Sequence, residues 1–210
     1  MSEDLGREMA KDRSLQSGHV AAGGGPYPMQ SMLPLALTRF VAAYPDVSVH
    51  LIVRDWDELL QRLRGRAIEL FVAETSTLEN ESDISIEAMT PHPLFMVARA
   101  GHPLAGRSAL SLSDYFEYPL AALTRLPPRI LEPFRAAQRK SANPAVLLRH
   151  FPAIECNALP DVKELVLGTD AIMATTLPSV HNDLERGQLT LLGSEPWMLT
   201  RYAIITLRNQ

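Results

Sequence analysis

Cysteine is nearly absent from this sequence, and features that mark secreted or membrane proteins are missing as well. The 210 residues include one cysteine, Cys156, so no disulfide can form within the chain. A chain without disulfides fits a reducing compartment, and we expect a cytoplasmic protein. No apolar run reaches the roughly 20 residues that a membrane-spanning helix needs, and the charged N-terminus lacks the apolar stretch of a signal peptide.

Motifs of catalysis and of metal or cofactor binding are also missing. No two of the six histidines have the i, i+4 spacing of a helical metal site, and no cysteine–histidine cluster occurs. The sequence has no GxSxG motif and no phosphate loop, and the glycines at 23–25 are a poor match to a dinucleotide-binding fingerprint. We therefore expect no metal, no cofactor and no enzymatic activity. The net charge of −4 also argues against a basic nucleic-acid surface.

What the sequence does contain is a large apolar fraction, 46%, and a regular alternation of strands and helices. Residues 18–74 have the pattern strand, helix, strand, helix, strand. We expect Pro26–Pro28 to break the chain before a helix at 29–44, and Asp55 to cap the next helix with Glu58 as its capping-box partner. Such a run forms a parallel sheet, with ligands beyond the carboxyl ends of the strands and against helix N-termini. Because those N-termini are partly positive, we expect an anionic or polar small molecule.

The second half of the chain repeats this order. We expect helices at 111–115, 129–140, 160–168 and 178–186, and strands at 119–123, 153–156, 171–175 and 188–192. Gly168 is the predicted C-cap of its helix. Segments 94–99 and 202–206 are predicted to cross between two lobes, which gives a hinge with facing strand-end crevices. The acidic segment 75–83 is expected to be a solvated loop.

Several short motifs, in this order and spacing, resemble the effector-binding domain of LysR-type transcriptional regulators. They cover nearly the whole chain from Gly18 on: Leu33-Pro34, Phe40, Tyr44-Pro45-Asp46-Val47, Glu58-Leu59-Leu60, Leu63-Arg64, Ile68-Glu69-Leu70, His102-Pro103-Leu104-Ala105, Leu110 to Asp114, Tyr118-Pro119-Leu120, Leu165 to Gly168, Ala171-Ile172 and Leu177-Pro178. Asp170 stands where the family has a glycine, and the turn can survive because aspartate tolerates left-handed backbone.

The resemblance implies an α/β fold of the periplasmic-binding-protein type II kind, with two Rossmann-like lobes joined by two crossover strands. Residues 1–17 would be the end of a linker helix and a linker, residues 18–98 and 200–210 lobe I, and residues 99–199 lobe II. The winged helix-turn-helix DNA-binding domain would precede this sequence. The family usually has one more helix after the last strand, whereas this sequence stops at Gln210.

The resemblance also implies the function and the partners. A small effector would bind in the cleft between the lobes, and cleft closure would be relayed to the DNA-binding domains. The chain would form a homodimer or homotetramer, with dimers formed through residues 29–44 and 47–54. DNA would be contacted only through the missing domain, and no membrane would be involved.

Ligand-binding candidates lie at the predicted strand ends and helix starts. They are Tyr27, Pro28, Gln30, Trp56, Glu74, Thr124, Arg125, Arg129, Asn157, Thr175 and Thr176. Arg125 is the first choice for a carboxylate contact, with a solvated loop arginine as the alternative. Glu74 favours a guest that donates hydrogen bonds, or a salt bridge to Arg125. Trp56 is either a stacking wall or core packing, and Cys156 is either a redox sensor or a small buried residue.

Two other functions share this fold. A solute-binding protein of a transporter would need export, and the charged, linker-like N-terminus favours a regulator instead. An enzyme such as a deaminase or a prephenate-dehydratase-like domain would need an acid–base pair or a metal set, and the sequence presents neither.

Overall fold

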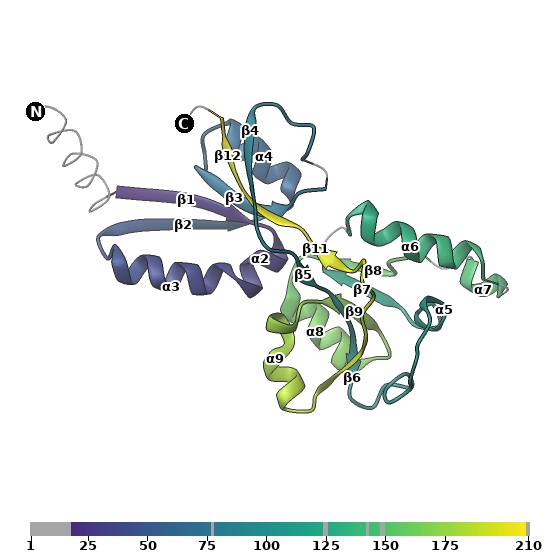
Figure 1. Cartoon of the computed structure of the whole chain (residues 1–210). Coiled ribbons are helices and arrows are strands. Elements are labelled where there is room, and N and C mark those ends of the chain that lie inside the picture. Colours follow the sequence, from purple (N-terminus) through teal and green to yellow (C-terminus); the bar gives the residue numbers. More distant parts are fainter. Residues whose placement is uncertain (1–17, 77, 124–125, 142, 148–149, 209–210) are drawn as a thin grey trace, which may run out of the picture. The chain divides into compact units, whose positions relative to one another are not determined.

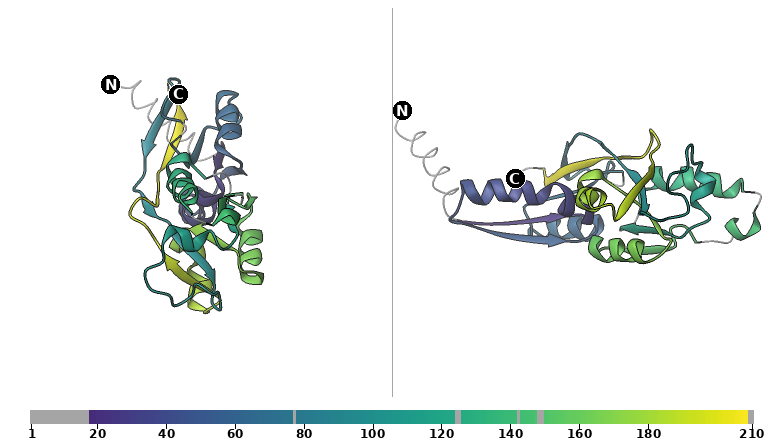
Figure 2. Two further views of the ribbon diagram at one scale, coloured as in Figure 1. Left: turned by 90° about the vertical axis from the view of Figure 1, so that its right-hand side faces the viewer. Right: turned by 90° about the horizontal axis from the view of Figure 1, so that it is seen from below.

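The computed structural model describes residues 18–76, 78–123, 126–141, 143–147 and 150–208 of a mixed α/β protein. The chain forms two compact units, and Figures 1 and 2 show their helices and strands. In the described part, unit 1 comprises residues 18–73, 82–87 and 204–208, and unit 2 comprises residues 74–81 and 88–203. The chain changes unit after Ala73 and again after residue 81, then within β4 (Ile84–Ala88) and within β12 (Tyr202–Leu207). The change after Ala203 falls within the segment 202–206 that we predicted as the return crossing, and the predicted lobe bounds stay a prediction.

Unit 1 contains a five-stranded sheet with the order β2-β1-β3-β12-β4. Its strands β1 (Gly18–Gly24), β2 (Val47–Val53) and β3 (Leu70–Glu74) are parallel, as the alternation of strands and helices predicted. The helices between them are α2 (Pro26–Ser31), α3 (Leu33–Ala43) and α4 (Trp56–Arg64). Figure 1 shows α3 alongside the β1–β2 pair.

The segment after β1 differs from the prediction. Pro26 and Pro28 do not break the chain; they form the first turn of α2, where a missing backbone N–H costs nothing. The predicted single helix is instead divided at Met32, which has φ −124° and separates α2 from α3. The loss of one continuous helix follows from Pro34, which cannot donate the hydrogen bond that would join the two.

The glycines at the end of β1 serve close packing. A Cβ atom on Gly23 would lie 2.4 Å from Cδ2 of Leu59, a fully buried residue of α4. The predicted buried stripe of α4 is confirmed for Leu59, Leu60 and Leu63. Asp55 is the N-cap, but the predicted capping box is wrong because the Glu58 carboxylate instead accepts hydrogen bonds from two arginines, Arg54 and Arg62.

Unit 2 contains a second five-stranded sheet, with the order β10-β6-β9-β7-β8. Its strands are β6 (Phe95–Arg99), β7 (Leu120–Leu123), β8 (Ile154–Cys156), β9 (Ile172–Thr175) and β10 (Leu189–Gly193). Strands β7, β8 and β9 are parallel, and β6 is antiparallel to both β9 and β10. A small sheet joins β5 (His92–Pro93) and β11 (Leu199–Thr200).

Helices cover both faces of this second sheet. They are α5 (Leu112–Tyr115), α6 (Pro128–Arg139), α7 (Pro144–Leu147), α8 (Leu159–Gly168) and α9 (Leu177–Glu185). One core cluster joins alternate residues of β6, β7 and β9 to α5 and α6, and α8 contacts the same strands. Because side chains alternate along a strand, α8 covers the other face. Segment 94–99 is therefore not the crossing strand that we predicted, since Leu94, Met96 and Ala98 belong to the core of unit 2.

The buried His102 explains why the sequence has His-Pro-Leu-Ala after β6. Its Nδ1 accepts a hydrogen bond from the backbone N–H of Leu104 at 3.0 Å, so Nε2 carries the hydrogen and donates to the carbonyl of Asp170 at 3.2 Å. The Asp170 carboxylate accepts a 2.6 Å hydrogen bond from Arg99. This cluster joins the turn after β6 to the start of β9.

The predicted C-cap at the end of α8 is wrong, and the turn that follows forms without the left-handed backbone that we had considered for Asp170. Gly168 is the last helical residue, and the C-cap is Thr169, whose hydroxyl donates to the carbonyl of Leu165 at 2.7 Å. Asp170 does not adopt left-handed backbone, since among the described non-glycine residues only Arg66 and Ala109 have positive φ. The acidic loop also differs from expectation, because Leu78 within it is fully buried.

The start of α5 gives a first testable prediction. The Asp114 carboxylate accepts hydrogen bonds from the backbone N–H and the hydroxyl of Ser111 at 2.8 and 2.6 Å, and from Arg107 at 2.9 Å. Replacing Asp114 by alanine should lower the free energy of unfolding by about 1 kcal/mol, the usual value of a helix cap. Urea denaturation at pH 7 measures this difference.

The same carboxylate makes the difference depend on pH. The hydrogen bonds from Ser111, followed by the charge of Arg107, hold the pKa of Asp114 below its ordinary value of 3.8. A group with a lowered pKa stabilises the fold fully above its unfolded-state pKa, and the stabilisation is lost as the pH falls through the folded-state value. The gap between wild type and Asp114→Ala should therefore be constant near neutral pH and shrink below about pH 4. A gap that stays constant down to pH 3 would contradict this.

Candidate functional site

The carboxyl ends of three parallel strands define one edge of unit 2. Strand β7 leads to α6, β8 leads to α8 and β9 leads to α9, so all three helices begin where these strands end. Helix N-termini carry partial positive charge and unpaired backbone N–H groups. This edge can therefore attract an anion. The candidates Thr124 and Arg125 follow β7 but lie outside the described residues.

A charged network centred on Arg129 lies at the start of α6. Its Nε and Nη2 donate to Oε1 of Glu74 at 3.1 and 2.7 Å, and Nε also contacts the hydroxyl of Ser76 at 3.0 Å. Ser76 donates to both carboxylate oxygens of Glu74, through its hydroxyl at 2.8 Å and its backbone N–H at 2.9 Å. Glu74 is the last residue of β3 and is grouped with unit 2. The structure thus pairs Glu74 with Arg129, where we had offered Arg125 as its salt-bridge partner.

This network determines which charged groups a ligand can reach. The side chains of Arg129 and Glu74 are 20% and 21% exposed, so both charges are held mostly out of water but remain within reach of a solute. Within the described part of the chain, no hydrogen bond occupies Nη1 of Arg129. A guanidinium has five N–H donors in a planar fork. Arg129 can therefore bind an anion through Nη1, or through its whole fork if Glu74 moves away.

Three other candidates lie at the carboxyl ends of β8 and β9. Asn157 is exposed directly after β8. Thr175 is 1% exposed, and its hydroxyl oxygen has no hydrogen-bond partner within the described residues. Thr176 is the N-cap residue of α9, with its hydroxyl 2.9 Å from that of Ser179. A buried hydroxyl without a partner is costly, so Thr175 is a polar group that a ligand or water can satisfy.

Cys156 ends β8 beside these residues. It is partly buried, and its sulfur contacts the backbone of Ala158, accepting from the N–H at 3.4 Å and donating to the carbonyl at 3.7 Å. It is the only cysteine of the sequence, so no second thiol of this chain can pair with it. Both sulfur contacts are local, which fits the structural interpretation of Cys156 better than a redox role.

The four candidates in unit 1 lie on two helices. Tyr27 and Pro28 are buried in the first turn of α2, and Gln30 is exposed on the same helix. Burial raises the pKa of the Tyr27 phenol far above its ordinary value, so it stays protonated. Trp56 is the first residue of α4 and is half-buried, which leaves part of the indole accessible. That these residues and those of unit 2 contact one ligand stays a prediction.

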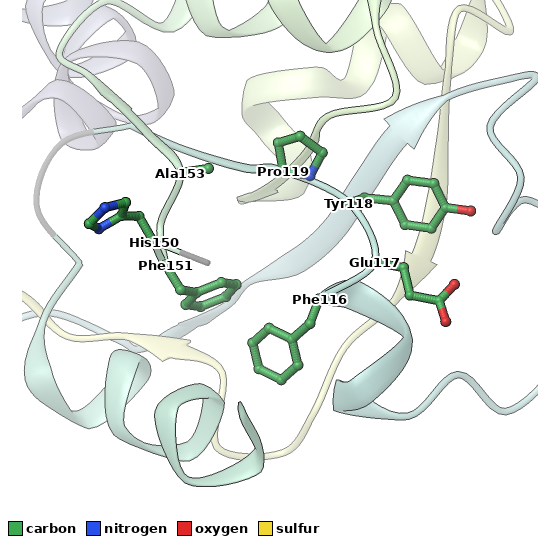
Figure 3. A pocket seen from close by; sticks show the side chains of 7 residues that line it. All are labelled: Phe116, Glu117, Tyr118, Pro119, His150, Phe151 and Ala153. Atoms are coloured by element: carbon green, nitrogen blue, oxygen red, sulfur yellow. The ribbon is translucent and has the colours of Figure 1, made fainter. Parts of the chain in front are cut away.

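A separate cavity of about 310 Å³ lies elsewhere on unit 2. Figure 3 shows its lining side chains, which come from the segment before β7 and the segment before β8: Phe116, Glu117, Tyr118, Pro119, His150, Phe151 and Ala153. The rings of Phe116 and Phe151 meet edge to face, with centroids 5.0 Å apart. The cavity therefore lies at the amino ends of β7 and β8, away from the edge that holds Arg129, and none of the predicted site residues lines it.

Sequence reasoning missed two members of the site. Ser76 and Ser179 complete the hydrogen bonding of Glu74 and Thr176. A serine two residues after a strand-end glutamate, or three residues after a helix N-cap, is a local pattern that could have indicated them. The described residues contain no group of three or more histidine, cysteine, aspartate or glutamate side chains placed to hold a metal ion. In the same part of the chain, no helix is long and apolar enough to cross a bilayer.

Comparison with known proteins gives a family and a curated relative. Residues 13–210 match the LysR substrate binding domain model. The SDS degradation transcriptional activation protein of a Pseudomonas species is 34% identical over 190 residues, which are 90% of this chain and 59% of that protein. The chain thus spans less than two thirds of this curated relative.

Solved structures give the same fold. A cysteine mutant of OxyR from Corynebacterium glutamicum superposes with a TM-score of 0.72 at 20% identity, covering 100% of this chain and 64% of that one. The regulatory domain of CcmR from Synechocystis, solved in complex with 2-PG, gives a TM-score of 0.69 at 19% identity, covering 92% and 89%. The fold is therefore the type II periplasmic-binding-protein-like fold of these domains. With the family model matching almost its whole length, the chain belongs to the LysR substrate-binding domain family.

Proposed function

We propose that this chain is the effector-sensing domain of a LysR-type transcription regulator and that it binds a small anionic metabolite. Ligand binding shifts the population of its conformations, and the shift is passed to DNA-binding domains that the regulator carries elsewhere. Such a protein is not an enzyme and works in the cytoplasm, where its DNA is. The family match and the regulatory role of the Pseudomonas relative support this function.

The observation that carries the ligand class is Arg129 at the carboxyl edge of unit 2. Its guanidinium has an unoccupied Nη1 within the described residues, and three helices begin at the same edge. Guanidinium groups bind carboxylates, sulfates and phosphates through paired hydrogen bonds, which single ammonium groups cannot match. The buried hydroxyl of Thr175 adds a donor or acceptor on the strand next to β7.

Two relatives favour an anion over a neutral guest. The name of the Pseudomonas relative refers to the degradation of SDS, an alkyl sulfate, and the CcmR domain was solved with 2-PG. We propose an alkyl sulfate or a small carboxylate as the ligand class for this chain. In the structure without ligand, the Glu74 carboxylate occupies Nε and Nη2 of Arg129. A bound anion either displaces this carboxylate or binds the remaining N–H groups of Arg129.

A thermal-shift screen tests the function. The probes are hexyl sulfate, inorganic sulfate, short aliphatic and aromatic carboxylates, and amino acids, each followed by chromatography of the probe after incubation. We expect at least one anion to raise the melting temperature in proportion to ln(1 + [L]/Kd) and to be recovered unchanged. No shift with any anion would contradict the ligand class, and conversion of the bound probe would contradict a regulatory domain.

The same screen addresses the alternative of a solute-binding protein. Such a protein would bind without conversion too, but it would not act on DNA. Fusing the chain to the DNA-binding region of the Pseudomonas relative and measuring ligand-dependent promoter activity separates the two. The regulator proposal requires a response to the bound anion, and a fusion that binds the anion but never responds would favour transport.

A further inference from the structure

Two histidines far apart in the sequence lie side by side on the sheet of unit 1. In the β1–β2 register His19 is opposite Ser48, and Ala21 is opposite His50. Residues opposite each other in a sheet, and residues two apart along a strand, share a face. His19, Ser48 and His50 therefore lie on one face of the β1–β2 pair, whose two strands run together in Figure 1.

The two imidazole rings are close and nearly parallel. Their centroids are 6.4 Å apart with an interplanar angle of 30°, and both residues are exposed. The Nδ1 atom of His19 is 3.3 Å from the hydroxyl of Ser48. Strand pairing creates this arrangement, so a search for histidines at helical spacing could not have found it.

One metal ion can bind both rings once they turn, because the lone pair of an imidazole nitrogen lies in the ring plane and the rings are stacked in the structure. A metal–nitrogen bond of about 2.0–2.1 Å and a tetrahedral or square-planar angle place two bound imidazole centroids roughly 5 Å apart. The centroids must approach from 6.4 Å by roughly 1.4 Å, and each ring must turn a nitrogen toward the ion, which rotation about the side-chain torsions provides at an exposed site. The hydrogen bond between Nδ1 of His19 and the Ser48 hydroxyl is long, at 3.3 Å, and metal binding can replace it.

We propose that His19 and His50 chelate a divalent transition-metal ion at the surface of unit 1. Imidazole pairs suit copper, nickel and zinc, and Cu²⁺ binds most tightly in this series. Because no third histidine, cysteine or carboxylate joins them among the described residues, two or more coordination positions are open to water or to a ligand from another molecule. The site is independent of the effector function proposed above and would be occupied whether or not an anion is bound.

Titration of tag-free protein with CuCl₂ in a non-coordinating buffer tests the site, with glycine as competitor and electron paramagnetic resonance as the second readout. We expect one strong site with two nitrogen ligands, and at least a 10-fold loss of affinity in both His19→Ala and His50→Ala. His181→Ala is the matched control, because His181 is also exposed and its Nε2 lies 3.2 Å from Oε1 of Glu185, another potential ligand pair. It should bind Cu²⁺ like wild type.

The histidine variants should fold, so a loss of copper affinity can be assigned to the missing ligand. Neither histidine is in the core, and circular dichroism checks that each variant is folded. Copper should also raise the melting temperature of wild type more than that of the double variant, because the ion bridges β1 and β2 only in the folded state. Equal affinities for wild type and the double variant, or a loss confined to His181→Ala, would overturn the proposal.

Discussion

Replacing Lys163 by methionine should lower the free energy of unfolding of unit 2 by about 3 kcal/mol or more. Lys163 on α8 forms an ion pair with Asp183 on α9, and the two side chains are 23% and 12% exposed. Within the described residues, the paired oxygen of Asp183 has no hydrogen-bond donor to replace the ammonium. The variant therefore leaves a carboxylate buried without a partner, which is the costly way to break such a pair.

Substituting the acidic partner, Asp183, should lower the free energy of unfolding by less. In Asp183→Asn the ammonium of Lys163 loses its charged partner, but Lys163 is more exposed than Asp183, so the ammonium can turn toward water. We expect about 1–2 kcal/mol for Asp183→Asn. The double variant Lys163→Met/Asp183→Leu should be close to wild type, because apolar replacement of a buried pair is often neutral or stabilising.

Fluorescence of a single tryptophan makes the measurement specific to unit 2. The two tryptophans fall in different units, Trp56 in unit 1 and Trp197 in unit 2, where it packs against Phe134. Urea denaturation in a Trp56→Phe background then reports unit 2 through Trp197. Equal costs for Lys163→Met and Asp183→Asn, both below about 0.5 kcal/mol, would show that the pair behaves like an exposed one.

Charging the outer surface of α3 should abolish self-association. No described residue of α3 is buried, and Leu35 and Val41 are 58% and 48% exposed. The neighbouring β2 is an edge strand of its sheet. Exposed apolar side chains beside an open strand edge are typical of a surface that another molecule covers. We propose that a second copy of this chain covers α3 and β2, the segments through which the resemblance implied dimers.

The double variant Leu35→Glu/Val41→Glu tests this surface. Glutamate is a good helix former, so α3 itself should persist, while two charges placed in an apolar interface should weaken the dimer at least 100-fold, or about 2.7 kcal/mol. Leu147→Glu is the matched control, because Leu147 is as exposed as Val41 but lies on α7 of unit 2. Sedimentation should show wild type and Leu147→Glu as dimers at micromolar concentration and the double variant as a monomer. Wild type sedimenting only as a monomer would contradict the proposal.

The order of the elements could be predicted from the sequence because hydrophobic periodicity reports it directly. The stripe Leu59, Leu60 and Leu63 and the run 120–123 are buried in the structure as their spacing indicates. Predictions failed where one residue has two possible local roles. Proline can interrupt regular structure or occupy the first turn of a helix, and Pro26 is the first residue of α2. Glycine can be the C-cap that follows the last helical residue or can itself be that last residue, and Gly168 is the last residue of α8.

Long-range pairing was the second limit. Glu74 was recognised as a strand-end carboxylate, but several arginines of the sequence were possible partners, and only the fold shows that Arg129 pairs with it. His19 and His50 become neighbours through a strand register that periodicity does not specify. The crossing between units was misplaced for the same reason, because an apolar strand such as 94–99 suits a core strand and a crossing strand equally well.

Calorimetric titration of the strongest anion from the screen, into wild type, Arg129→Gln and Glu74→Gln, tests the central claim most directly. Loss of the guanidinium should weaken binding by 10- to 100-fold, about 1.4–2.7 kcal/mol, the range of a charge-assisted hydrogen bond. Neutralising Glu74 should strengthen binding, because it removes the anion that now occupies Arg129. Equal affinity in all three proteins would show that the effector does not bind at Arg129 and would contradict this account.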